Sequence, residues 1–446
     1  MRKLLVPFCL LILIFVFALS SGSALERQPG ADYHARREAL AKKAGGVVLL
    51  FAPLEGRDAL YGFRQDDNFY YLSGVTIPGA ALLIAPAADA QGDSPARAYT
   101  EVLFLPPRNL RMEKYTGVQL GADNPDAPKI AGFDHVEEMG KLPEEVAKLL
   151  VNGRPVIYTD VASEGETPPS TEPLAFLRRT NAVVSFQDVT PMLASLRTVK
   201  DAGEIALIRK AVYASVAAHL AAMKAVKPNV TEYEISALMQ YEWGRRGCER
   251  PAYSPIVGSG HNSTVLHYSD NTETMKAGDV VVIDAAGEYS MYAADITRTL
   301  PINGHFTARQ KEIYDIVLGA QEAAMAAFQS GKSTLVGDSD ASLNKAARDY
   351  IKSHGKDLHG QPLDQYFIHG LGHYIGLNVH DAGDYKIPLG PGMAFTIEPG
   401  IYIPEENLGV RIEDDFLVGQ DGKLIKLSSA LPSKADDVEE VMAGKH

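Results

Sequence analysis

Carboxylates in or at the end of apolar, strand-like runs constrain the fold of this chain more than any other feature. Asp284 ends the run VVVID, and Glu398 lies in the apolar segment FTIEPG, which closes with Pro399 and Gly400. A lone carboxylate buried in an apolar strand is very costly, so such a group must be paired or must coordinate a metal. The sequence therefore predicts that Glu398 belongs to a polar or metal-binding site.

Two further acidic segments strengthen this prediction. Asp295 lies in AADITRT, eleven residues after Asp284, and we expect it on the return strand of a hairpin whose turn includes Gly287. Glu413 lies in RIEDDFLV, beside two aspartates. A single aspartate at a strand end is more often a turn or cap residue, but two that flank one hairpin favour a shared site.

Histidines are concentrated in the same part of the chain. Eight of the twelve lie between His261 and His380, and the segment FIHGLGHYIGLNVHD alone contributes His369, His373 and His380. Three glycines in this segment make a helix unfavourable, because each costs about 1 kcal/mol there. Any one of these histidines could be an ordinary core residue, but three together indicate a functional site.

The chain divides into two parts of different texture. Up to about residue 186, apolar strand-like runs at 46–53, 80–86, 101–107 and 155–160 alternate with helical stretches such as 142–153, which predicts an α/β domain. After a boundary near Leu196 we expect long helices at 202–225 and 232–246, and others near 308–329 and 339–353. Thr231 and Glu234 have the spacing of a capping box at the start of the second of these helices.

The first 24 residues have the pattern of a secretory signal peptide. Arg2 and Lys3 precede a 16-residue uncharged run, and small residues follow at 20–24. The run is shorter than the roughly 20 residues that a membrane span prefers. We therefore expect an exported protein, periplasmic or secreted, with an uncleaved N-terminal membrane anchor as the alternative. After cleavage no stable membrane span is expected.

Composition excludes several classes of protein. The chain has 43 Lys and Arg against 56 Asp and Glu, a formal charge of −13, so it lacks the basic footprint of a nucleic-acid binder. Its two cysteines are Cys9, inside the signal segment, and Cys248. The processed chain can therefore form neither an internal disulfide nor a cysteine-rich zinc site.

Taken in order, the acidic and histidine motifs resemble the pita-bread metallopeptidases of family M24. The matching segments are IDA with Asp284, ADITRT with Asp295, HGLGH with His373, TIEPG with Glu398, and RIEDD with Glu413. Upstream, FRQDDNFYYLSG at 63–74 resembles the N-terminal domain of the aminopeptidase P and prolidase branch. With the signal peptide expected over 1–24, the resemblance implies an α/β N-terminal domain over 25–195 and an α+β pita-bread catalytic domain over 196–446.

The resemblance also implies a ligand set for two divalent metal ions. Asp284 is assigned to one ion, His373 and Glu398 to the other, and Asp295 and Glu413 to both. Four carboxylates supply about −4 against +4 from two ions. One nitrogen among many oxygens suits Mn²⁺ better than a nitrogen- and sulfur-rich zinc site would, with Co²⁺ or Zn²⁺ as alternatives.

Other residues match positions of the family that face the substrate. His267 in VLHYSDN is expected to face the substrate, and His380 in NVHD to polarise the scissile carbonyl. Glu398 is expected to carry a proton from water to the leaving nitrogen. The resemblance places His369 and Arg411 in the substrate pocket or beside a ligand. His261, in GSGHN, stands where relatives often carry an acidic or other polar residue, and it could alter how the substrate's amino terminus is held.

The expected activity is removal of an N-terminal residue that precedes proline. The substrates would be peptides with proline in second position, and the resemblance also implies a homo-oligomer. One alternative is a prolidase restricted to Xaa-Pro dipeptides. Another is a metal-free pita-bread binding module or a creatinase-like hydrolase, but such proteins lose the metal ligands, and all five are present here.

Overall fold

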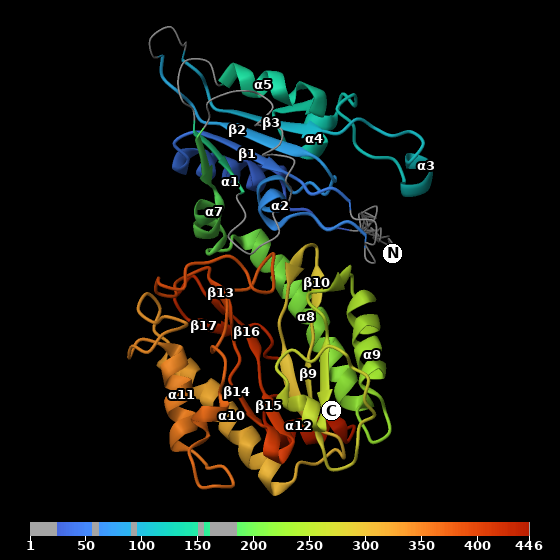
Figure 1. Cartoon of the computed structure of the whole chain (residues 1–446), viewed down its shortest axis with the longest axis vertical. Coiled ribbons are helices and arrows are strands. Elements are labelled where there is room, and N and C mark those ends of the chain that lie inside the picture. The colour runs from blue at the N-terminus through green and yellow to red at the C-terminus, as the bar shows by residue number, and fades with distance from the viewer. Residues whose placement is uncertain (1–24, 56–61, 91–95, 150–155, 161–184, 446) are drawn as a thin grey trace, which may run out of the picture.

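The computed structural model describes residues 25–55, 62–90, 96–149, 156–160 and 185–445. The expected signal segment, residues 1–24, lies outside the described residues. Two parts are stacked along the long axis of the molecule, the first extending to α7 (Thr190–Arg197) and the second beginning with α8 (Ala202–Ala225) (Figure 1).

The first part is an α/β domain around one mixed sheet, in the order β4-β3-β2-β1-β5-β6. Its central strands are buried because they consist almost entirely of apolar residues, as in VVLLF and ALLIA. The edge strands HVEE and SFQD are polar, which explains why an apolar pattern did not reveal them. The strands are β1 (Val47–Phe51), β2 (Ala81–Ala85), β3 (Thr100–Leu105), β4 (His135–Glu138), β5 (Val156–Thr159) and β6 (Ser185–Asp188).

Short helices accompany this sheet. The helix expected over 142–153 is α5, which the structure describes over Leu142–Leu149, and the expected end at residue 153 lies outside the described residues. The other helices are α1 (Gly30–Lys43), α2 (Asp67–Ser73), α3 (Glu113–Thr116) and α4 (Ala127–Ala131). The predicted α/β class of this part is confirmed.

The helices of the second part begin where the sequence provides caps. The predicted capping box at Thr231 and Glu234 is present at the start of α9 (Glu232–Gly244), and Asp201 with Glu204 forms another at α8. The remaining helices are α10 (Ala308–Ala327), α11 (Leu343–Ser353) and α12 (Ala435–Met442). Among the described helices, α8 alone is long and apolar enough to cross a membrane, but 56% of its most apolar stretch is buried within the protein, as in a core helix.

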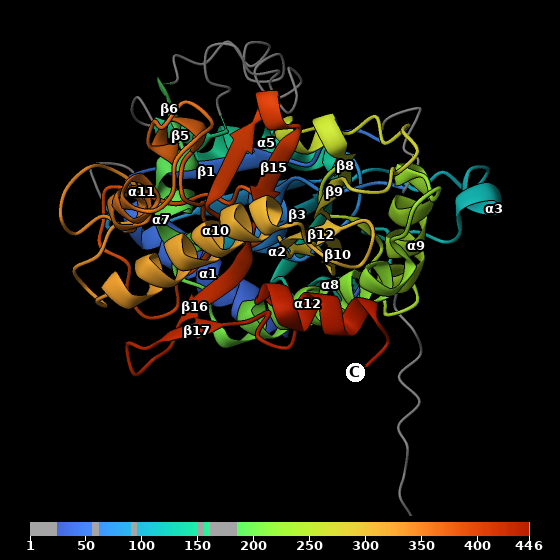
Figure 2. The ribbon, with the colours of Figure 1, turned by 90° about the horizontal axis from the view of Figure 1, so that it is seen from below.

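The second part has the pita-bread arrangement of strands between helix pairs. Figure 1 shows the strands lying between α8 and α9 on one side and α10 and α11 on the other, and Figure 2 shows the same layers from below. The sheets are β8-β9-β12, β13-β16-β17, β14-β15 and β7-β10-β11, all antiparallel. Their bounds are β7 (Arg250–Pro251), β8 (Ile256–Ser259), β9 (Val280–Asp284), β10 (Gly287–Tyr289), β11 (Tyr292–Ala293), β12 (Thr297–Pro301), β13 (Ala394–Ile397), β14 (Gly400–Ile403), β15 (Leu408–Arg411), β16 (Asp414–Val418) and β17 (Leu424–Lys426).

The hairpin around Asp284 differs in detail from the prediction. Strands β9 and β12 do pair, with Asp284 opposite Thr297, but Gly287 starts a separate strand rather than lying in the turn. The turn lies at Ser290 and Met291, which both have positive φ angles. Asp295 therefore precedes the return strand instead of lying on it.

Glu398 likewise does not lie within a strand. β13 ends at Ile397 and β14 begins at Gly400, so Glu398 occupies the corner between them. Glu413 lies in the corresponding position between β15 and β16. The backbone of Glu413 pairs there with Thr297, the first residue of β12, which fixes this carboxylate beside the hairpin that carries Asp295.

Candidate metal centre and active site

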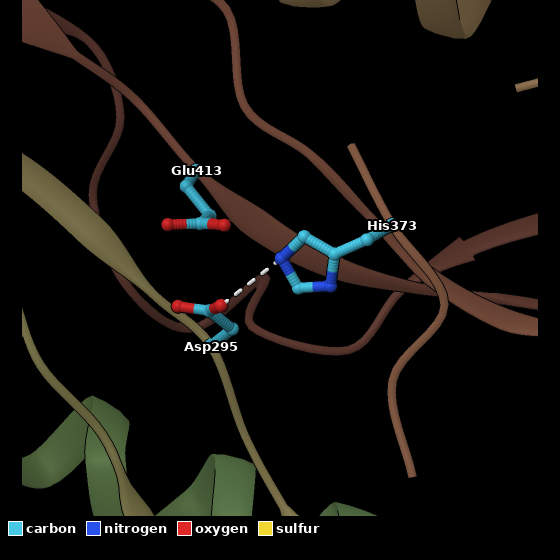
Figure 3. A group of neighbouring side chains, drawn as sticks. All are labelled: Asp295, His373 and Glu413. Atoms are coloured by element: carbon cyan, nitrogen blue, oxygen red, sulfur yellow. Dashed lines mark ion pairs between the residues drawn. The ribbon is translucent and has the colours of Figure 1, made fainter. Parts of the chain in front are cut away.

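Three side chains from distant segments meet at the centre of the second part. Ligand atoms of Asp295, His373 and Glu413 all lie within 4.8 Å of one another (Figure 3). His373 Nε2 lies 3.3 Å from Asp295 Oδ2. A histidine nitrogen and carboxylate oxygens at this spacing form a donor set suited to a divalent cation.

Asp284 joins this group through a tyrosine. The Tyr253 hydroxyl lies 2.6 Å from Asp284 Oδ1 and 2.6 Å from Asp295 Oδ1, so it links the two carboxylates. Arg411 Nη2 donates to the other Asp284 oxygen at 2.6 Å. These contacts orient both aspartates from outside the donor set.

Glu398 joins the group beside His373. Its Oε1 lies 3.3 Å from His373 Nε2 and accepts a hydrogen bond from Thr396 Oγ1 at 3.2 Å. The backbone of His373 also pairs with Thr396, whose N–H donates to the His373 carbonyl at 2.8 Å. This close approach requires Gly372, because a Cβ there would lie 2.1 Å from the Thr396 carbonyl oxygen. The glycine spacing that argued against a helix thus serves this packing.

These groups line a cavity of about 440 Å³. His267 and His380 are exposed on its wall, and His369 hydrogen-bonds Tyr402 at 2.8 Å. The structure does not bring His261 into the cavity, because its ring faces Asn407 Oδ1 at 3.1 Å. The lining residues are Tyr253, Ser254, Ile256, Leu266, His267, Ser269, Asp284, Asp295, His369, Gly370, Gly372, His373, Val379, His380, Glu398, Arg411 and Glu413.

The pKa values of Glu398, Glu413 and His373 are all raised at this site, where several carboxylates are buried close together. Burial raises the pKa of Glu398 to about 7, assisted by Asp295 and opposed by His373. Burial also raises the pKa of Glu413 well above its ordinary value, with Asp295 adding to the effect. Burial works to lower the pKa of His373, but Asp295 and Glu398 outweigh it and raise that pKa to about 9.

In contrast to His373, the pocket histidines His369 and His380 have lowered pKa values. Burial, followed by the positive charge of Arg411, lowers the pKa of His369 to about 4. Burial, followed by His373, also lowers the pKa of His380. Both imidazoles are therefore neutral near pH 7, and each can donate one hydrogen bond and accept another.

The donor set fits a bound metal. Glu413 Oε1 and Asp415 Oδ1 are buried and have no hydrogen-bond partner within the part of the chain that the structure describes. Unpartnered buried carboxylate oxygens are costly, and a divalent cation beside Glu413 would offset that cost. The residues that would hold it are Asp284, Asp295, His373, Glu398 and Glu413.

Sequence reasoning missed two residues of this site. Tyr253 has no local signal, since its two aspartate partners are 31 and 42 residues away. Asp415 follows Glu413 by two residues in the sequence; it is fully buried, and its Oδ2 accepts the backbone N–H of Asp295 at 3.0 Å. The segment RIEDD with three consecutive acids was the one available hint.

The first part of the chain contacts the histidine-bearing segment. Asp381, next to His380, is buried and pairs with Arg197 Nη2 at 2.5 Å and Lys200 Nζ at 2.9 Å. Arg64, in the segment FRQDDNFYYLSG, donates to the Leu377 carbonyl at 2.6 Å. The histidine segment is therefore held from the first part of the chain as well as from its own sheet.

This chain is similar to known proteins over most of its length. Residues 206–420 match Metallopeptidase family M24, and residues 33–158 match Aminopeptidase P, N-terminal domain. The Xaa-Pro aminopeptidase of Escherichia coli strain K12 is 34% identical over 453 residues, covering 94% of this chain and 98% of the relative. That of Haemophilus influenzae is 33% identical over 447 residues, with the same coverage of both chains. Intermediate cleaving peptidase 55 of Schizosaccharomyces pombe is 28% identical, covering 94% of this chain and 88% of the relative.

Solved structures are similar over the same length. Proline aminopeptidase P II from Yersinia pestis superposes with a TM-score of 0.79 at 31% identity, covering 93% of this chain and all of that one. Aminopeptidase P from E. coli with the inhibitor Pro-Leu gives a TM-score of 0.81 at 31% identity, covering 94% and 99%.

Proposed function

Because this chain belongs to metallopeptidase family M24 and carries an aminopeptidase P N-terminal domain, we propose that it is a metal-dependent Xaa-Pro aminopeptidase. Such an enzyme hydrolyses the bond between the first residue of a peptide and a following proline. One observation carries this proposal most directly. A single cavity of about 440 Å³ gathers all five expected metal ligands and the histidines His267, His369 and His380.

The cofactor we propose is a pair of divalent ions, with Mn²⁺ first and Co²⁺ or Zn²⁺ as alternatives. Support comes from the oxygen-rich donor set, in which His373 supplies the one nitrogen. When bound, such ions lower the pKa of a water and polarise a carbonyl. Elemental analysis of the purified protein should give two metal ions per chain, and one ion at full activity would reject the paired site.

In the proposed reaction, water adds to the carbonyl carbon of the first residue and the C–N bond to proline breaks. Glu398 lines the cavity beside His373, where it can take the proton of the water and pass it to the departing nitrogen. His267 and His380 lie on the cavity wall, where either can hydrogen-bond the carbonyl oxygen as it gains negative charge. Proline has no N–H, so the site needs no acceptor at that atom.

A comparison of three substrates tests the proposal. With Mn²⁺ present, the enzyme should cleave Xaa-Pro-Yaa after the first residue, act at least as fast on it as on Xaa-Pro, and act little on Xaa-Ala-Yaa. Fast cleavage of the dipeptide alone would support the prolidase alternative. A preference for Xaa-Ala-Yaa would reject proline specificity, and retained activity after complete metal removal would reject the metal requirement.

We also propose that the protein is exported and that residues 1–24 are removed. Residue 26 is already held in the described structure, because the Glu26 N–H donates to Ser290 Oγ at 2.7 Å and Glu26 pairs with Lys210. A cut near residue 25 would therefore leave these two contacts of Glu26 in place. N-terminal sequencing of protein from the native host should start near residue 25, whereas Met1 in a membrane fraction would favour the anchor.

The proposed quaternary state is a homo-oligomer. Four large apolar side chains around α3 are exposed and offer a surface for association: Leu110, Met112, Tyr115 and Val118. Light scattering of the purified protein should give a mass above 48.2 kDa, and a monomer mass would reject this proposal.

A further inference from the structure

A second buried carboxylate, outside the metal centre, organises one wall of the cavity. Glu232, the first residue of α9, is fully buried, and no salt bridge to it occurs among the described residues. Its Oε1 accepts from Ser259 N and Ser259 Oγ, both at 2.8 Å, and from Asn262 Nδ2 at 3.3 Å. Its Oε2 accepts from Tyr268 Oη at 2.9 Å and from Glu273 N at 2.9 Å. One side chain thus draws both ends of the segment 259–273 together.

The segment 259–273 carries His267. Within the described part of the chain the imidazole makes no hydrogen bond, although it lines the cavity. Its position therefore depends on its neighbours along the backbone. On one side of His267, Arg411 Nη2 donates a hydrogen bond to the Leu266 carbonyl at 3.3 Å. On the other side, the Tyr268 hydroxyl donates to Glu232 Oε2.

Ser263, in the first half of the segment 259–273, is also held by strand β15. Ser263 Oγ accepts the Gly409 N–H at 2.8 Å, and a Cβ at Gly409 would lie 1.9 Å from the Ser263 carbonyl oxygen. In the second half of the segment, Asn271 Oδ1 accepts the Val257 N–H of β8 at 2.8 Å. Tyr268 itself donates its backbone N–H to the Val265 carbonyl within the segment, and its hydroxyl bonds Glu232 and the Thr272 N–H. Among the described residues, the hydrogen bond that ties Tyr268, next to His267, to another segment is the one to Glu232.

We propose that Glu232 is a positioning residue, which holds His267 at the cavity wall through Tyr268 and the backbone of 259–273. An ionised carboxylate suits this role because it only accepts hydrogen bonds, and bonds to a charged acceptor are stronger than neutral ones. An amide of the same shape would turn an NH₂ group toward donors and leave some of them unpaired. The inference rests on the proposed function, in which His267 contacts the substrate carbonyl.

The test is a double-mutant cycle with His267. Glu232→Gln should lower kcat for Xaa-Pro-Yaa by about tenfold, with a smaller change in KM, because the histidine acts on developing charge. In a His267→Ala background the same substitution should change kcat by less than about twofold. Tyr268→Phe should act in the same direction with a smaller loss, and it leaves the carboxylate four other donors. The matched control is Glu234→Gln, which removes an exposed acid that bonds Thr231 at the same helix end.

A second measurement does not depend on activity. Hydrogen exchange of the peptide 259–273 in the metal-free protein should be faster in Glu232→Gln, because the amides of Ser259 and Glu273 lose their acceptor, and unchanged in Glu234→Gln. If Glu232→Gln lowers kcat by the same factor in the wild-type and His267→Ala backgrounds, Glu232 has only a structural role, and the inference is overturned. Full activity of His267→Ala would instead reject the proposed role of the histidine, so the two failures are distinguishable.

Discussion

Replacing Asp295 by asparagine should abolish metal binding and activity together. Asp295 faces His373 and Glu413 in the donor group and shares the Tyr253 hydroxyl with Asp284. Asparagine keeps the shape of the side chain and can still accept the tyrosine hydroxyl, so the fold should survive. The change removes one negative charge from the position that we assign to both ions.

The size of the effect follows from simple electrostatics. At an effective dielectric constant of about 20, two unit charges about 4 Å apart interact by about 4 kcal/mol, and a divalent ion doubles that value. Desolvation and the residual dipole of the amide offset part of the loss. Even half of the doubled value, about 4 kcal/mol, weakens metal binding by about a thousandfold.

The assay is metal content after dialysis against buffered Mn²⁺, combined with thermal unfolding with and without the metal. Wild-type protein at a free metal concentration of about 100 times Kd should gain about 2.7 kcal/mol in stability, and Asp295→Asn should gain almost none. His380→Ala should retain its metal while turnover falls, because His380 is outside the donor group. Asp315→Asn, an exposed acid on α10, is the surface control.

Two outcomes would refute this reasoning. Normal metal content in an inactive Asp295→Asn would show that the residue serves chemistry and not binding. Equal metal loss in Asp295→Asn and His380→Ala would show that our division between metal ligands and substrate-facing histidines is wrong.

Three further predictions concern residues around the site. Tyr253→Phe removes the hydroxyl that links two ligands, so we expect metal affinity to fall by about 10- to 100-fold in chelator competition with the fold intact; unchanged affinity would contradict this. Asp381→Ala removes the buried carboxylate shared by Arg197 and Lys200 and leaves Arg197 only the longer pair with Asp67 at 3.5 Å, so urea unfolding should show a loss of about 3–5 kcal/mol, whereas a loss below about 1 kcal/mol would argue against a buried pair. Burial lowers the pKa of His219 to about 4 from an ordinary 6.5, so the folded state disfavours its protonation. The contribution of His219 to the free energy of unfolding should be complete above pH 6.5 and should be lost as the pH falls toward 4, by about 3 kcal/mol in urea unfolding. The variant His219→Gln should show a weaker dependence of stability on pH in this range.

The sequence by itself determined much of the local structure and the identity of the ligands. Helix α9 begins at the predicted capping box, and the apolar run VVVID forms β9 with Asp284 at its end. These features depend on residues within a few positions of one another. The ordered acids and histidines revealed the family because metal chemistry requires those side chains whatever their exact orientation.

Only the tertiary structure decided how these groups meet. Tyr253 bonds two aspartates on other strands, Glu398 lies at a corner between strands, and Glu232 closes a segment that ends 41 residues further along the chain. His261 has the right chemistry for the pocket but faces Asn407 outside it. These contacts arise from strand register and close backbone approach between distant segments, and no local pattern of residue types encodes that geometry.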